Sequence, residues 1–300
     1  MFEKFILGDI VINTIVDFPD QEWPAGLLIP SSDPRSLDDS IYAPVETYNS
    51  DTGGLRLKFG GYLFEALGKV VLVDCGVGAQ KMRTPHPDWN MREDASFIDS
   101  LRQCGYKPSD IDIVIITHAH VDHVGWLTVR AAGEWEPTFP NAKHVFSRVE
   151  LDYVLDEYQS DPDVNFGSTG DSVVPLLGRV EVVRAEDGYH PVPGVTVRVY
   201  PGHTPGNSAI WLESGGEVAV ICGDTVHHPI QLRYPEWSSG FCLDPHESSN
   251  GRRRLLNEVV DRRAYLLPSH FRLGPVRLRR SGDHYEFFQN FDGEISSDAP

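Results

Sequence analysis

The stretch THAHVDHVGW, residues 117–126, constrains the fold of this chain more than any other. It places His118, His120, Asp122 and His123 within six positions, directly after the apolar run IDIVIIT. On a helix, residues two apart point to different sides, and on a strand His123 would face away from the other three. Only a turn can direct all four side chains toward one point. The alternative is a turn that carries four unrelated polar residues at the surface.

The run IDIVIIT is itself typical of a short buried strand, because it is β-branched and carries no charge after Asp112. The four polar residues therefore follow the C-terminal end of a strand, where open α/β sheets commonly place their sites. Histidine combined with aspartate is a ligand set that suits divalent metals. We therefore expect a metal site on this loop.

Three later segments repeat this context, each with a single potential ligand directly after an apolar strand. His203 lies in PGHTPGNS after VTVRVY, Asp224 lies in ICGDTVHH after EVAVIC, and His270 ends LLPSH after a short apolar run. One such residue would mean little. Three of them at strand ends argue against independent accidents, so we expect them to complete the site.

Apolar periodicity and turn residues predict an α/β chain with no linker between its strands, and hence a single domain over residues 1–300. Residues 19–54 are rich in Pro, Ser, Asp and Gly and read as one long loop, a candidate lid or dimer arm. A hairpin that turns at Ser281 and Gly282 closes the chain. The other predicted strands are 5–16, strands within 55–78 that turn at Gly68 and Lys69, 111–117, 195–200, 208–214, 217–223 and a strand that ends in YLLPSHF, residues 265–271. The predicted helices are 95–104, a segment from Ser147, and 248–262.

Charge and composition disfavour several classes of partner. The net charge of −18 at pH 7 argues against nucleic acid and anionic membranes, because phosphate contacts need clustered Lys and Arg. The one basic cluster, Arg252–Arg254, fits a solvated helix face. The four cysteines form no CxxC pair, and neither a signal-peptide pattern nor a span-length apolar segment is visible. These features favour a cytoplasmic protein with reduced thiols.

Taken together, HxHxDH, then GHTPG, then GDT, then a late His resemble the metallo-β-lactamase-fold hydrolases, and the likeness includes the VDCG segment ahead of the first loop. The resemblance implies an αββα four-layer sandwich, two mixed sheets with helices outside and two divalent metal ions at one edge between the sheets. Zinc is the first expectation, with iron, cobalt or manganese as alternatives. One ion would be held by His118, His120 and His203, the second by Asp122, His123 and His270, and Asp224 would bridge them.

Within this superfamily the chain is most similar to the N-acyl homoserine lactonase and methyl parathion hydrolase branch, through HVDHVGW, PGHTPG and GDTVHHPIQ. The resemblance implies a metal-bridging hydroxide that opens a small apolar ester, most simply a lactone, and a homodimer, since relatives often dimerise. Asp122 would also handle a proton. Asp74 would support the metal loop, although a cap of a helix or turn is the alternative.

Comparison with the sequence patterns of the superfamily excludes some of its branches and leaves the substrate of this chain open. Asp224 argues against β-lactamases, which lack the bridging carboxylate, and His120 argues against flavin-dependent di-iron relatives, which have Glu there. Asn207 and the FRLGP run depart from the lactonase pattern and leave the substrate open. The alternatives are an organophosphate or aryl ester hydrolase, a glyoxalase-II-like thioesterase, and a mononuclear iron persulfide dioxygenase.

His227 occupies a position where many lactonases carry a substrate-contacting Tyr and phosphotriesterase-like relatives carry His. We expect it to donate a hydrogen bond to a substrate oxygen, with packing as the alternative; His228 beside it is a weaker candidate. Five aromatic residues fall in loops near the expected mouth of the site, where they would line a pocket or simply pack in the core: Trp23, Trp89, Trp126, Trp237 and Phe241. The remaining histidines, which are His86, His144, His190, His246 and His284, are not expected to be ligands.

Overall fold

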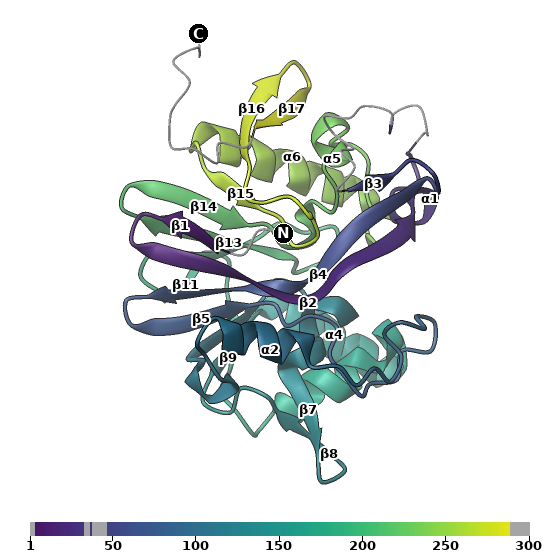
Figure 1. Cartoon of the computed structure of the whole chain (residues 1–300), viewed down its shortest axis with the longest axis vertical. Helices are drawn as coiled ribbons and strands as arrows, with labels where there is room; N and C mark the ends of the chain where they lie inside the picture. The colour runs from purple at the N-terminus through teal and green to yellow at the C-terminus, as the bar shows by residue number, and fades with distance from the viewer. Residues whose placement is uncertain (1–3, 33–36, 38–46, 289–300) are drawn as a thin grey trace.

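The computed structural model describes residues 4–32, 37 and 47–288, and two β-sheets form its centre (Figure 1). The larger sheet has eight strands in the order β1-β2-β4-β5-β6-β9-β10, with β3 paired to β4. The smaller sheet has five strands in the order β11-β12-β13-β14-β15. The larger sheet consists of β1 Lys4–Leu7, β2 Ile10–Pro24, β3 Tyr48–Asn49, β4 Gly54–Ala66, β5 Lys69–Val73, β6 Ile113–Ile116, β9 Lys143–Ser147 and β10 Val182–Ala185, and the smaller of β11 Tyr189–Val192, β12 Val195–Val199, β13 Ser208–Ser214, β14 Glu217–Ile221 and β15 Tyr265–Leu267.

Helices α2, Ser96–Gln103, and α4, Arg148–Ser160, cover the outer face of the larger sheet, and α6, Pro245–Asp261, covers that of the smaller sheet (Figure 1). Phe97 and Leu101 of α2 pack with Leu72 and Val114 of the larger sheet. On the other side, helix α6 packs its apolar face on the smaller sheet. The prediction of an αββα four-layer sandwich is therefore confirmed. The helices are α1 Ala25–Leu28, α2 Ser96–Gln103, α3 Val121–Val124, α4 Arg148–Ser160, α5 Ile230–Arg233 and α6 Pro245–Asp261, and two peripheral hairpins are β7 Thr128–Ala131 with β8 Glu134–Pro137 and β16 Arg277–Ser281 with β17 His284–Phe288.

A continuous apolar layer fills the space between the sheets. Val71 and Ile113 from the larger sheet pack in one cluster with Ile210 and Ile221 from the smaller one. The strand β6 shows why its sequence lacks alternation: it pairs in parallel with β5 and β9, and all four of its residues are buried. A strand that is covered on both faces needs apolar residues at every position.

The strand ends place the predicted ligands at one edge of the sandwich. The loops that follow β6, β12, β14 and β15 begin directly after the last paired residues of these strands. Because β14 and β15 run parallel, their C-terminal ends meet at the same edge of the smaller sheet. The loop after β6 approaches from the larger sheet, and a backbone hydrogen bond from Ser208 N to Thr117 O joins the two sheets there at 2.8 Å.

The interval 19–54 is not one long loop, which corrects that part of the prediction. Strand β2 continues to Pro24 and pairs with β4, α1 and β3 follow, and residues 33–36 and 38–46 lie outside the described part of the chain. Pro19 falls in an irregularity of the β2–β4 pairing between Phe18 and Gln21, where its missing N–H costs no ladder bond. The expected role as a lid or dimer arm stays a prediction.

The prediction that Arg252–Arg254 form a solvated helix face is wrong for Arg252. Arg252 is fully buried, and its guanidinium donates to Thr225 O at 2.9 Å, Pro235 O at 2.8 Å and Trp237 O at 3.0 Å. A cation can be buried here because several carbonyl oxygens accept its hydrogens. Arg252 thus fastens α6 to the loop that carries Asp224.

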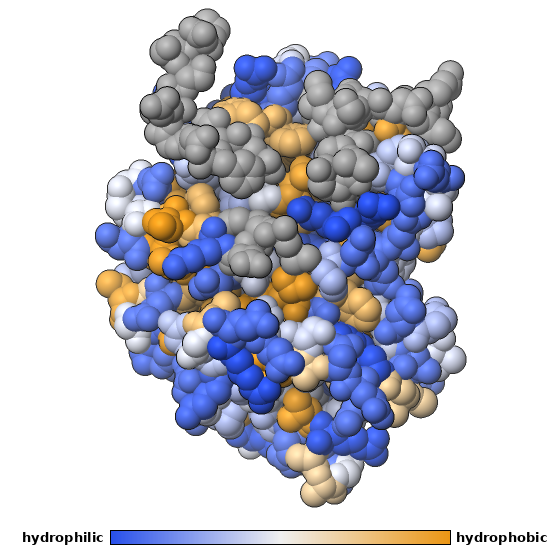
Figure 2. Space-filling model, in the orientation of Figure 1, coloured by the Kyte–Doolittle hydropathy of each residue, from blue (hydrophilic) through white to orange (hydrophobic). Residues whose placement is uncertain are grey.

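The outer surface is predominantly hydrophilic on the face shown in Figure 2, and apolar residues gather there in small groups. Among the residues that the structure describes, none of the helices combines the length and the apolar character that a transmembrane span requires.

Candidate metal centre

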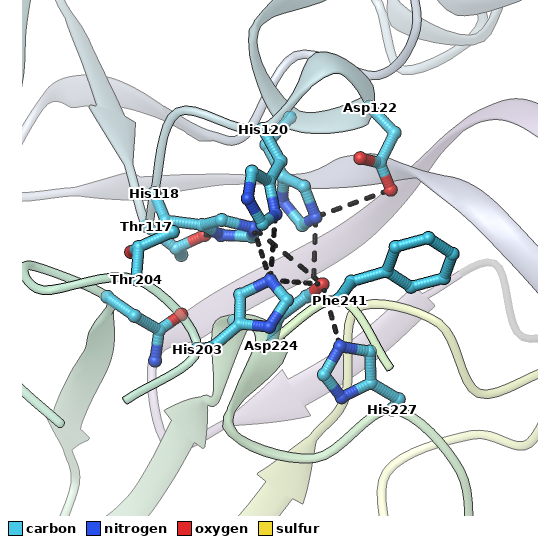
Figure 3. Close-up of polar contacts among 12 residues, drawn as sticks. Thr117, His118, His120, Asp122, His203, Thr204, Asp224, His227 and Phe241 are labelled. Atoms are coloured by element: carbon cyan, nitrogen blue, oxygen red, sulfur yellow. Dashed lines mark hydrogen bonds and ion pairs between the residues drawn. The ribbon is translucent and has the colours of Figure 1, made fainter. Parts of the chain in front are cut away.

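Three imidazoles converge at the edge between the two sheets (Figure 3). Nε2 of His203 lies 3.1 Å from Nε2 of His118 and 2.9 Å from Nδ1 of His120. His118 and His120 lie on the loop after β6, whereas His203 lies on the loop after β12. Three ring nitrogens that face one another across so small a space form a group that could hold one metal ion.

A second group lies beside the first and consists of Asp122, His123 and His270. Oδ2 of Asp122 lies 3.6 Å from Nε2 of His123 and 3.6 Å from Nε2 of His270. The short helix α3 begins directly after His120 and carries both Asp122 and His123. This group could hold a second ion.

Asp224 stands between the two groups with one oxygen toward each. Its Oδ2 lies 3.3 Å from Nε2 of His203 and 3.7 Å from Nε2 of His118. Its Oδ1 lies 3.2 Å from Nε2 of His123 and 2.9 Å from Nε2 of His270. A carboxylate in this position could bridge two cations.

Four of the imidazoles turn their second nitrogen outward to a partner. Nδ1 of His123 lies 2.9 Å from Oδ2 of Asp74, and Nδ1 of His270 lies 3.0 Å from the carbonyl oxygen of Lys58. His118 has the hydroxyl of Thr117 at 3.2 Å, and His203 has the sulfur of Cys242 at 3.5 Å. Outer partners of this kind fix the tautomer and the ring orientation of metal-bound histidines.

The inner atoms, in contrast, lack partners that would satisfy them. Nε2 of His123 and Oδ1 of Asp224 are buried and make no hydrogen bond of good geometry among the described residues. Burial lowers the pKa of His118 and His203 well below the usual value of imidazole and lowers the pKa of His120 to about 4. These rings are neutral near pH 7 and offer lone pairs inward. The arrangement fits divalent cations better than it fits a set of hydrogen bonds.

His227 also reaches the centre, and His228 does not. Nε2 of His227 lies 3.2 Å from Oδ2 of Asp224, and neither of its ring nitrogens makes a hydrogen bond of good geometry in the described structure. His228 is fully buried, and its ring contacts Thr47 O at 3.0 Å and Ile230 N at 3.2 Å. Of these two residues, His227 lines the pocket over the centre, and His228 does not.

Two side chains that the sequence did not single out hold the first loop. Glu150 of α4 is fully buried and accepts from Ala119 N at 2.8 Å through Oε1. Its Oε2 accepts from the Thr204 hydroxyl at 2.7 Å and from Gly206 N at 3.0 Å, so one carboxylate joins both histidine loops. Asn165 donates to Ala119 O at 2.6 Å. In sequence, Glu150 looked like one more acid on an amphipathic helix.

A pocket opens over the centre and is lined mainly by apolar and aromatic side chains. Five of these side chains are Trp23, Leu57, Phe59, Trp89 and Phe241. Among the described residues that line the pocket, none is Lys or Arg.

The sequence left open whether the five candidate aromatic residues line a pocket or pack elsewhere, and the structure shows both. Trp23, Trp89 and Phe241 line the pocket, whereas Trp126 packs against Phe97 in the core and Trp237 stacks on Tyr234. His86 and Phe166 line the pocket and were missed. His86 faces Phe166 at 4.9 Å between ring centroids, across segments 80 residues apart in the chain. No pattern within one segment predicts such a contact.

Comparison with known proteins gives a family match. A model of the metallo-beta-lactamase superfamily matches residues 62–270. An N-acyl homoserine lactonase of Bacillus thuringiensis subsp. kurstaki is 27% identical over 133 residues, which cover 44% of this chain and 44% of that protein. The match thus spans less than half of that relative. A probable metallo-hydrolase of Mycobacterium bovis is 26% identical over 259 residues, covering 78% of this chain and 79% of that one.

Solved structures share the fold over nearly the whole chain. AidC, a dizinc quorum-quenching lactonase, has a TM-score of 0.77 at 18% identity and covers 96% of this chain and 97% of its own. The hydrolase AbOPH has a TM-score of 0.77 at 21% identity and covers 98% of both chains. At these identities, the likeness shows a common fold.

Proposed function

The chain belongs to the metallo-beta-lactamase superfamily, and we propose that it is a two-metal hydrolase of small, neutral, apolar esters, with a lactone as the first candidate substrate. The observation that carries this proposal is Asp224, whose two oxygens each face one group of potential ligands. His118, His120 and His203 would hold one ion, Asp122, His123 and His270 the other, and Asp224 both. When bound, the ions would supply Lewis acidity and lower the pKa of water to about 7.

The protein's own residues would orient the substrate and move the proton. Neither ring nitrogen of His227 is satisfied, so His227 can donate a hydrogen bond to the carbonyl oxygen or the leaving oxygen of an ester. Asp122 is the partly exposed carboxylate of the second group, and we assign it the transfer of a proton to the leaving oxygen. The apolar rings above the centre would exclude water from the acyl or aryl part of the substrate.

The pocket supports a lactone or a simple ester over the glutathione thioester of a glyoxalase-II-like enzyme. A glutathione moiety carries carboxylates, and the described lining offers no Lys or Arg to bind them. A second candidate is an aryl ester or aryl phosphotriester, favoured by one specific feature. Trp23 packs against Trp89 at 5.9 Å and against Phe241 at 5.4 Å between ring centroids. The aryl group of a substrate could pack against these three rings.

A substrate panel with metal analysis tests the proposed function. The zinc-loaded enzyme should hydrolyse N-acyl homoserine lactones or aryl esters and leave acyl-glutathione untouched. His120→Ala and Asp224→Asn should each lower turnover by more than about 100-fold, more than the loss of an outer partner usually causes. His246→Ala and Asp99→Asn change exposed residues and are the matched controls. Turnover of thioesters alone, or one iron per chain with persulfide oxidation, would overturn the proposal.

The role of His227 has a separate test. His227→Phe removes both ring nitrogens and should lower kcat by about 100-fold, the scale for one lost donor to a developing oxyanion. His227→Tyr restores an O–H donor and should recover part of the rate. Metal content, measured on the same samples, should not change in either variant. If Phe and Tyr give equal rates, or if the metal is lost, His227 does not act on the substrate.

A further inference from the structure

A second, smaller cavity lies next to the candidate metal centre, because its lining includes Asp74, which contacts His123, and Ser269, which precedes His270. Its polar lining consists of Thr14, Lys58, Tyr62, Asp74 and Ser269. Thr14, Lys58, Tyr62 and Asp74 are all at least nine-tenths buried. The cavity is large enough for one small particle, such as a water molecule or a small ion.

Lys58 brings a positive charge to this cavity without a counter-charge. Its side chain is buried, with an exposed fraction of 5%. Its one hydrogen bond is to the oxygen of Tyr62 at 3.4 Å, and the Tyr62 hydroxyl donates in turn to Pro268 O at 2.7 Å. In the described ranges, no carboxylate lies within ion-pair distance of Lys58. Burial lowers the pKa of Lys58 to about 8, as expected for an ammonium group that lacks a counter-ion.

Two hydroxyl groups in the same lining are also unsatisfied. The Thr14 and Ser269 oxygens are buried and make no hydrogen bond among the described residues. Asp74 is the one carboxylate of the lining, and its oxygens are already engaged. Oδ1 accepts from Thr117 N at 2.8 Å, and Oδ2 contacts the Thr117 hydroxyl at 2.8 Å and His123 Nδ1 at 2.9 Å. The lining therefore offers the Lys58 ammonium and two unpaired hydroxyls as donors to a particle in the cavity.

We propose that this cavity binds one monovalent anion of halide size, held by the Lys58 ammonium and the hydroxyls of Thr14 and Ser269. A water molecule would satisfy the two hydroxyls but would leave the charge of Lys58 uncompensated. Buried charges in proteins are paired, because an isolated ion loses its hydration on burial. A single anion would both compensate the charge of Lys58 and accept hydrogen bonds from the two hydroxyls.

The anion would act on the metal centre through His270. The Lys58 carbonyl accepts from His270 Nδ1 at 3.0 Å, and Lys58 N donates to His270 O at 3.1 Å. Ser269 directly precedes His270. Two of the three residues that would bind the anion, Lys58 and Ser269, are therefore joined directly to His270, by backbone hydrogen bonds or by the peptide bond. Halide should stabilise the fold and slow the loss of the ion held by that group.

Crystals of the zinc-loaded full chain grown or soaked in bromide give a direct test. An anomalous bromide peak in the cavity, bounded by Lys58, Thr14 and Ser269, supports the proposal. Lys58→Met fills the same space without the charge, and its crystals should lack the peak. A cavity that holds only a water-like density in bromide, or a peak that persists in Lys58→Met, would overturn it. No substrate enters this experiment, so its outcome is independent of the proposed function.

A solution test uses chloride against gluconate at equal ionic strength, because gluconate is too large for the cavity. At about ten times the Kd, chloride should raise the Tm of the zinc-loaded protein by about 2–4 °C. The rise should vanish in Lys58→Met and shrink in Thr14→Val, which keeps the charge and guards against a misfolded first variant. Lys107→Met, at an exposed lysine, should keep it. An equal chloride response in Lys58→Met and Lys107→Met would refute an anion at Lys58.

Discussion

At the scale of single residues, each histidine of the site has two ring nitrogens with different roles. In His123, one nitrogen faces the candidate metal positions and the other contacts a side chain that orients the ring. His123 turns Nε2 toward Asp224 and Nδ1 toward Asp74, so the orientation of its ring depends on both carboxylates. Asp74 itself has a left-handed backbone with a φ of 60°, which few residues adopt without strain. Its position between β5 and the first loop thus combines an unusual backbone with an outer partner of the centre.

Asp74→Asn tests this outer contact with little change of shape. Asn tolerates left-handed backbone, so the fold should persist. The amide is uncharged and supports the ring of His123 less well, so metal affinity or turnover should fall by about 10–100-fold. Competition with a chromogenic chelator measures the affinity, and Asp99→Asn at an exposed position is the control. Unchanged affinity and turnover would show that Asp74 acts only as a structural cap.

At the scale of elements, α4 holds the two histidine loops together through one side chain. Glu150 accepts three hydrogen bonds, and their donors belong to the loop after β6 and the loop after β12. The two loops come from different sheets, so their relative position depends on this link as well as on any bound cation. Glu150 is therefore a positioning residue for both.

Glu150→Gln should destabilise the protein by about 3 kcal/mol, because an amide group would face hydrogen-bond donors in place of an acceptor. Urea unfolding of the zinc-loaded protein measures the change. Glu157→Gln lies on the exposed side of the same helix and should stay within about 0.5 kcal/mol of the wild type. A Glu150→Gln variant as stable as Glu157→Gln would show that the loops do not depend on the carboxylate.

The sequence revealed those features whose cause is local. The ligand candidates follow apolar strands directly, so this local context marked His203, Asp224 and His270, and the structure brings them to the first loop. Glu150 and Lys58 have no local sign of their role, because their contacts arise only when distant segments pack. The extension of β2 past Pro19 was hidden for a related reason: the residue looks like a strand breaker until its place in an irregular pairing is known.

At the scale of the whole molecule, the sandwich brings loops from two sheets to one edge and leaves an apolar pocket above them. The larger sheet supplies His118 and His120, and the smaller sheet supplies His203 and Asp224. Divalent ions at this edge would therefore connect the two sheets. This is the central claim of the proposed function: a pair of cations, shared by both halves of the fold, at the floor of the pocket.

An anomalous difference map at the zinc edge, from crystals of the zinc-loaded protein, tests this claim most directly. We predict two peaks in each chain. One should lie among His118, His120 and His203 and the other among Asp122, His123 and His270, with one oxygen of Asp224 toward each. A single peak, or two peaks away from the 118–123 turn, would contradict the account.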